Sequence, residues 1–77
     1  MAGMTNWEWW AGEIGAETYD LACGEKTRDA AFKTASDLLD PGTEFQIVEA
    51  RTSTAAKYEG ADFVPFVRTR NYERATA

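Results

Sequence analysis

Two groups of mainly charged residues in this sequence could form a functional site, and in both cases the function would be binding. The acidic group comes with three tryptophans and comprises Trp7, Glu8, Trp9, Trp10, Glu13, Glu17, Asp20, Asp29, Asp37 and Asp40. The basic group lies near the C-terminus and comprises Arg68, Arg70, Asn71, Tyr72 and Arg74. Clustered carboxylates would complement a basic groove of the kind that normally holds nucleic acid. Guanidinium groups beside an aromatic ring would bind phosphate.

Each group also has a plain structural interpretation. Acidic side chains commonly form a solvated face that keeps a protein soluble. The arginines of the C-terminal segment could pair within the molecule, with carboxylates of the acidic half, and we favour this pairing over phosphate binding.

The residue types needed for catalysis are missing. The sequence has no histidine, which removes the commonest general base and the commonest metal ligand at neutral pH. Cys23 is the single cysteine and has no histidine to activate it, so we interpret it as a small buried residue. No glycine-rich phosphate loop or calcium-loop pattern occurs. We therefore expect no enzyme, no cofactor and no metal site.

The length and charge of the chain limit its class. Its 77 residues make one domain without an internal linker, and a single cysteine cannot form an internal disulfide. Without a signal-peptide pattern or an apolar run of about 20 residues, a cytoplasmic protein is expected. The net charge is −5, with eight acids and three bases in residues 1–40. This imbalance argues against direct nucleic-acid binding and favours a protein partner with a basic surface.

The sequence predicts one helix, at 27–40, and this helix must position the candidate binding residues. Thr27 is a suitable N-cap, and Pro41-Gly42 ends the helix because proline cannot continue it. At about 100° per residue, one face collects the apolar side chains of Ala31, Phe32, Ala35, Leu38 and Leu39. Asp37 lies near the negative end of the helix dipole, where a carboxylate is unfavourable.

The remaining segments predict a sheet under this helix. In chain order we expect a hairpin at 6–23, the helix, a strand at 43–51, a loop at 52–60, an edge strand or extended segment at 61–68 and a frayed polar tail at 69–77. A right-handed crossover through the helix makes the strands on either side of it parallel, with the first strand between them. The prediction is a two-layer α+β fold: a mostly antiparallel three- or four-stranded sheet in β-β-α-β order, with one helix on one face.

Tryptophans fall on both faces of the first strand. Trp7, Trp9 and Trp10 occupy four positions, so the alternation of a strand divides them between the faces. One helix covers only one face. The other tryptophans must be covered by the 61–68 segment or the loop, by a protein partner, or by a second copy in a homodimer.

A short acidic chain of this kind resembles the small phage-encoded anti-CRISPR proteins. The residues that carry the resemblance are the stretches 45–51 (FQIVEAR) and 65–71 (PFVRTRN), which look like parts of phage proteins. The resemblance implies a stoichiometric inhibitor that docks on a CRISPR effector complex and blocks target DNA, partly by mimicking its charge. It assigns a role to no individual residue. The alternatives are a small nucleic-acid-binding or regulatory module that uses the arginines, and a small dimeric structural phage-type protein.

Overall fold

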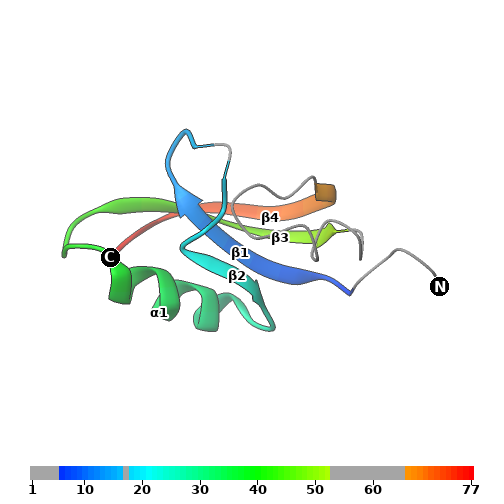
Figure 1. The fold of residues 1–77 in the computed structure, drawn as a ribbon, viewed down its shortest axis with the longest axis horizontal. Helices are drawn as coiled ribbons and strands as arrows, with labels where there is room; N and C mark the ends of the chain where they lie inside the picture. Colours follow the sequence, from blue (N-terminus) through cyan, green and yellow to red (C-terminus); the bar gives the residue numbers. More distant parts are fainter. Residues whose placement is uncertain (1–5, 17, 53–65) are drawn as a thin grey trace.

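The computed structural model describes residues 6–16, 18–52 and 66–77. Its elements are β1 (Glu8–Glu13), β2 (Ala22–Glu25), α1 (Arg28–Leu38), β3 (Glu44–Thr52) and β4 (Phe66–Thr76). The strands form one sheet in the order β2-β1-β3-β4, and α1 packs on one face of it (Figure 1). The predicted α+β class is confirmed. β1 lies between β2 and β3 and is antiparallel to both, so α1 connects two parallel strands as predicted.

Helix α1 begins where the sequence predicts and ends earlier. The Thr27 hydroxyl accepts a hydrogen bond from the Ala30 amide at 3.1 Å, which satisfies one of the first-turn donors. Leu39 is already extended, with φ −115°, so the last two residues of the predicted 27–40 helix lie outside it. The Asp37 carboxylate is 2.9 Å from the Lys33 ammonium one turn earlier. This exposed pair offsets part of the unfavourable interaction of Asp37 with the helix dipole.

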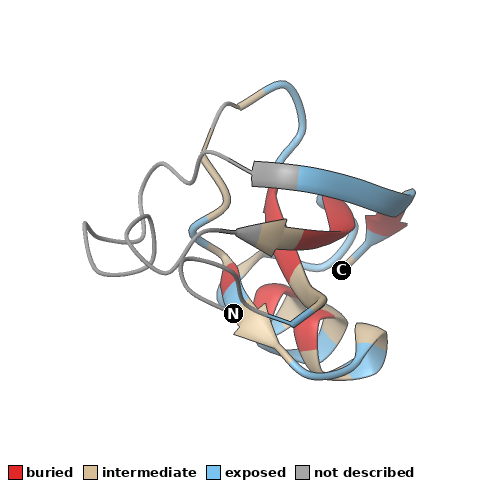
Figure 2. Cartoon of the chain, turned by 90° about the vertical axis from the view of Figure 1, so that its right-hand side faces the viewer, coloured by how far each residue is buried: buried red, intermediate tan, exposed pale blue. Residues whose placement is uncertain are grey.

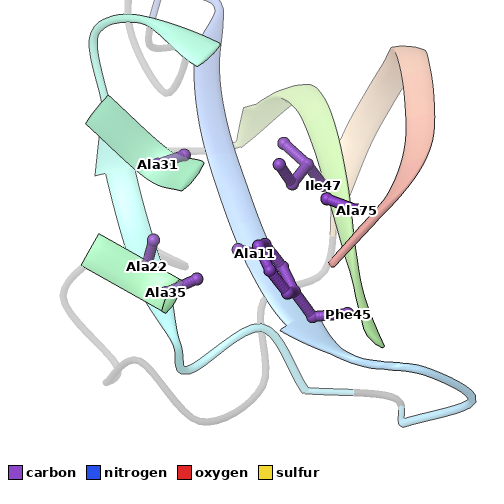
Figure 3. Close-up of a cluster of buried hydrophobic side chains, with 7 residues drawn as sticks. All are labelled: Ala11, Ala22, Ala31, Ala35, Phe45, Ile47 and Ala75. Atoms are coloured by element: carbon purple, nitrogen blue, oxygen red, sulfur yellow. The ribbon is translucent and has the colours of Figure 1, made fainter. Parts of the chain in front are cut away.

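The main core lies between α1 and the sheet. Figure 3 shows its buried side chains, which are Ala11, Ala22, Ala31, Ala35, Phe45, Ile47 and Ala75. Alanines on both layers allow the helix backbone to approach the strands closely, and the two large side chains from β3 fill the remaining space. Complete burial of each of these two stabilises the fold by about 2 kcal/mol. Leu38 was predicted on the inner face of the helix, but it is 65% exposed because α1 ends there.

The opposite face of the sheet carries a second, smaller cluster. Trp10, Val48 and Ala50 are buried there, and Tyr19 packs against them. The β1–β2 connection folds back over this face. It passes so close to Gly12 that a Cβ built there would lie 2.4 Å from the Thr18 carbonyl oxygen. The chain therefore covers part of the face that the helix leaves open.

The C-terminal residues form a strand and not the predicted tail. β4 has eleven residues and pairs with β3 along its length, at the edge of the sheet (Figure 1). Its end is fixed by backbone hydrogen bonds: Ala77 donates to the Thr43 carbonyl at 2.8 Å and accepts from Gly42 at 2.9 Å. Backbone pairing with β3 holds this strand along its length, and Ala75 near its end is buried in the main core. Most of its described residues are exposed, as their pale blue colour in Figure 2 shows.

Three other predicted segments have different boundaries in the structure. The second strand spans Ala22–Glu25 and so extends beyond the predicted 6–23 hairpin, and the residues before it belong to the connection that folds over the far face. The first residue of the predicted 52–60 loop belongs to β3. The last three residues of the predicted 61–68 segment belong to β4. The rest of both segments lies outside the described residues.

Candidate functional site

Three predicted acidic residues, Glu13, Asp20 and Asp40, lie at the end of β1 and in the connections that lead into β2 and β3. We call Glu13, Asp20, Asp40 and Glu44 the acidic end; all four are exposed. Glu13 pairs with Phe45 in the ladder, next to Glu44. Asp40 belongs to the turn that leads into β3, and its carbonyl oxygen accepts a hydrogen bond from the Thr43 amide. Asp20 precedes Leu21, whose amide donates to the Ala11 carbonyl. Turns and strand ends therefore present these carboxylates to solvent.

Other predicted acidic residues lie elsewhere. Asp29 is exposed at the start of α1, beside Arg28 at 3.2 Å, and Asp37 pairs with Lys33 on the outer side of the helix. Glu8 is half-buried, and its carboxylate lies 3.5 Å from the position of a Cβ built on Gly24. Glu17 is outside the described residues. The predicted acidic set is therefore divided among separate parts of the molecule.

The tryptophans do not form the exposed edge that the sequence suggested. Trp10 is 3% exposed and belongs to the cluster on the far face, so its assignment to a partner surface is wrong. Trp9 is half-buried against the core under α1. Trp7 is also half-buried, and the guanidinium carbon of Arg70 lies 4.0 Å from its ring centroid. Intramolecular packing therefore accounts for much of their surface.

A β-bulge in β4 decides which arginines share a face. In the ladder Glu73 pairs with Ile47 and Arg70 pairs with Glu49, so two residues of β4 oppose Val48. One of the two is Asn71, whose φ is 54°, a left-handed conformation that asparagine tolerates better than most residues. One extra residue shifts the alternation of the strand. Arg70 therefore lies on the helix side of the sheet, together with Glu49.

Arg70 is held firmly on that face. Its Nε donates to Glu49 Oε1 at 2.8 Å, and its second terminal nitrogen donates to Oε2 at 3.1 Å. The Asn71 amide also donates to Glu49 Oε1, at 2.8 Å. The Glu49 side chain is only 12% exposed. Hydrogen bonds from Arg70, and then from Asn71, lower the pKa of Glu49, while its desolvation acts in the opposite direction.

Two further arginines lie beside this pair, where β1, β3 and β4 run past the start of α1 (Figure 1). Arg51 and Arg68 oppose each other directly in the ladder, and Arg51 lies 5.9 Å from the Trp7 ring centroid. Like charges in directly opposite positions destabilise a sheet. We call these residues the arginine end, which comprises Trp7, Glu49, Arg51, Arg68 and Arg70.

The predicted phosphate-binding group is split by the sheet. Arg74 pairs with Gln46 in the ladder, on the far face, and reaches the Glu44 carboxylate at 3.4 Å. Tyr72 also lies there and donates its hydroxyl hydrogen to Gln46 Oε1 at 2.9 Å. Two arginines do pair within the molecule as we favoured, but with glutamates of β3 instead of the acidic N-terminal half. Sequence reasoning missed Trp7 and Arg51 as neighbours of this group, and Asn71 was the available signal for the bulge.

A second arginine–glutamate pair, also held by two parallel hydrogen bonds, joins α1 to β4. Arg28 Nε and its terminal nitrogen donate to the two carboxylate oxygens of Glu73, each at 2.9 Å. Its guanidinium carbon lies 4.9 Å from the Phe32 ring centroid. The hydrogen bonds from Arg28 lower the pKa of Glu73. These contacts fasten the start of α1 to β4, so the Arg28–Glu73 pair has a structural role.

The described parts of the chain offer surfaces rather than an enclosed site. Across residues 6–16, 18–52 and 66–77, no pocket is found and no three histidine, cysteine or acidic side chains are placed to hold a metal ion. Among the same residues, no helix combines the length and the apolar character that a membrane span requires. Comparison with protein-family models, with curated proteins and with solved structures finds no match to this chain.

Proposed function

We propose that the protein is a non-catalytic inhibitor that docks its acidic end on the basic surface of a protein partner. The observation that carries the proposal is the exposure of Glu13, Asp20 and Asp40, at the end of β1 and in the connections that lead into β2 and β3. None of the three forms an ion pair with another residue of the described segments. Carboxylates in this state keep their full charge available to a partner.

The proposed partner is a cytoplasmic complex that binds nucleic acid in a basic groove. A basic groove built for phosphates is the complement of a group of exposed carboxylates. The resemblance to phage anti-CRISPR proteins leads us to propose a CRISPR effector complex of a bacterial host. Occupation of the groove would then exclude target DNA.

Charge, more than apolar contact, would drive this association. Trp10 is buried and Trp9 packs under the helix, so these tryptophans are not part of the docking surface. Charge-driven association is fast at low salt and slows as salt screens the interaction. Binding through the acidic end should therefore weaken steeply as the ionic strength rises.

Two matched double variants test the proposal. Asp20→Asn with Asp40→Asn removes two carboxylates from the acidic end, and Asp29→Asn with Asp37→Asn removes two from the exposed side of α1. Both change the net charge equally. We expect the first variant to weaken binding to an effector complex by about tenfold and the second to have a smaller effect.

The measurements are association with purified effector complexes and the DNA binding of those complexes. Equal losses for the two variants would indicate a general charge effect and contradict docking through the acidic end. Failure of the unmodified protein to associate with any of them would remove the proposed inhibitor function.

A further inference from the structure

We propose that the arginine end binds a phosphate group of a short single-stranded nucleic acid, with Arg68 and the outer edge of Arg70 as donors. This site is at the opposite end of the sheet from the acidic end and does not depend on the function proposed above. It also differs from the group that the sequence suggested, because Arg74 and Tyr72 lie on the other face.

The first observation is the exposed guanidinium group of Arg68 at the start of β4. Arg68 stands directly opposite Arg51 of β3, so two guanidinium-bearing residues occupy facing positions in the ladder. Arg68 is exposed and forms no ion pair with another residue that the structure describes. A phosphate beside β4 would accept hydrogen bonds from Arg68 and neutralise its charge.

The second observation is the fixed orientation of Arg70. A guanidinium group has five N–H donors, and Glu49 takes one from Nε and one from a terminal nitrogen. Both oxygens of Glu49 are already hydrogen-bonded, and its side chain is largely buried. Stacking on Trp7 fixes the plane of the group. The donors that Glu49 leaves available are therefore held in place before a ligand arrives, which lowers the entropy lost on binding.

A phosphate fits these donors better than a carboxylate does. Arginine binds phosphate oxygens through two parallel hydrogen bonds, and a tetrahedral phosphate offers further oxygens to a second arginine. Arg68 and Arg70 come from the same face of β4, two residues apart, so one phosphate can meet both.

The ligand is a short single strand because the rest of the protein repels a longer one. The net charge is −5, and the acidic end would face the continuing backbone of a long duplex. A few phosphates at the arginine end avoid this repulsion. This inference revises the expectation, based on net charge alone, that the protein makes no direct contact with nucleic acid.

The test compares two arginines of the same strand on opposite faces. A fluorescent short oligothymidylate is titrated at low salt with the unmodified protein, with Arg68→Ala and with Arg74→Ala. We expect Arg68→Ala to weaken binding about tenfold and to reduce the slope of log affinity against log salt by about 0.7, the value for one phosphate contact on a single strand. Arg74→Ala should change the affinity less than threefold, about the size expected from net charge alone.

Competition identifies the chemical source of the phosphate. Displacement of the oligothymidylate by thymidine monophosphate supports a site for a terminal phosphate, and displacement only by unlabelled oligothymidylate supports a site for a phosphodiester. A glutamate peptide of equal charge that competes as well as the oligonucleotide would overturn the phosphate assignment.

Two further results would overturn the inference. One is the absence of binding by the unmodified protein at low salt, and the other is an equal loss for Arg68→Ala and Arg74→Ala. Both substitutions are at exposed positions, and the near-ultraviolet circular dichroism of the tryptophans verifies that each variant is folded. Neither variant alters a member of the acidic end, so failure here leaves the proposed inhibitor function to be judged separately.

Discussion

The two ends of the sheet carry opposite charges and are built in different ways. At the arginine end, a largely buried glutamate, a bulge and a stacked tryptophan hold one guanidinium group in place. At the acidic end, exposed carboxylates project from turns and strand ends, and the contact between Glu44 and Arg74 is exposed and long, at 3.4 Å. The comparison suggests two kinds of binding. The arginine end suits recognition of a defined group, and the acidic end suits attraction of a large complementary surface.

The largest expected difference between the ends concerns stability. Glu49→Gln keeps the shape of the side chain but removes the charge that pairs with Arg70. Because this carboxylate is largely buried and accepts three hydrogen bonds, we expect a loss of about 2 kcal/mol in the free energy of unfolding. The matched change Glu44→Gln affects an exposed pair and should cost less than about 0.5 kcal/mol. Urea denaturation measures both, and equal losses would show that the two pairs do not differ as described.

Acid should destabilise the protein partly through the same carboxylate. The folded-state pKa of Glu49 lies below its usual value, so this group stabilises the fold fully above its unfolded pKa of about 4.3. The contribution is lost as the pH falls from about 5 through the folded pKa. Glu49→Gln should therefore flatten the decline in stability below pH 5, which denaturation with urea at several pH values measures. Glu73 contributes in the same direction, so some decline should remain in Glu49→Gln.

Asn71 supports the bulge through its left-handed backbone conformation and through its hydrogen bond to Glu49, and two substitutions separate these effects. Asn71→Gly keeps the positive φ accessible and removes only the hydrogen bond to Glu49, whereas Asn71→Ala also places an unfavourable side chain in the left-handed conformation. We expect the alanine variant to be less stable than the glycine variant by about 1 kcal/mol. Thermal unfolding of the two proteins provides the comparison. Equal stabilities would mean that the backbone conformation of Asn71 does not matter.

The smallest expected effect is a gain in stability. Arg68→Glu places a carboxylate opposite Arg51 and should stabilise the sheet by a few tenths of a kcal/mol. The same substitution should abolish binding of the oligothymidylate, because it repels phosphate. A variant that is at least as stable and does not bind would show that Arg68 serves ligand binding and not the stability of the sheet. Lower stability would indicate that Arg68 has a structural role.

Much of the fold could be predicted from local signals. Thr27 and Pro41-Gly42 marked the limits of the helix to within two residues, because capping and proline geometry are local. The crossover rule gave the order of the first three strands. Apolar alternation identified β3, whose Phe45 and Ile47 are fully buried. Each of these features depends on residues that are close in the sequence.

The candidate site could not be predicted in the same way. Residues 68–74 of β4 are mostly polar, so apolar alternation did not identify this stretch as a strand, and its pairing with β3 depends on partners that are distant in the sequence. The bulge at Asn71 then reverses the alternation, which brings Arg70 to Trp7 across about sixty residues of sequence and separates it from Arg74. The burial of Trp10 depends on where the β1–β2 connection folds. These are tertiary effects that a short window of sequence does not contain.

A nuclear magnetic resonance titration tests the central claim most directly, namely that the arginine end is a distinct binding site. A short oligothymidylate is added to labelled protein, and the shifts of backbone amides and of the tryptophan indole N–H groups are followed. We predict shifts at the Trp7 indole, at Arg51 and at Arg68 to Arg70, with the amides of Glu13, Asp20 and Asp40 unchanged. Shifts spread evenly over the molecule, or concentrated at Arg74 and Tyr72 on the far face, would contradict the claim.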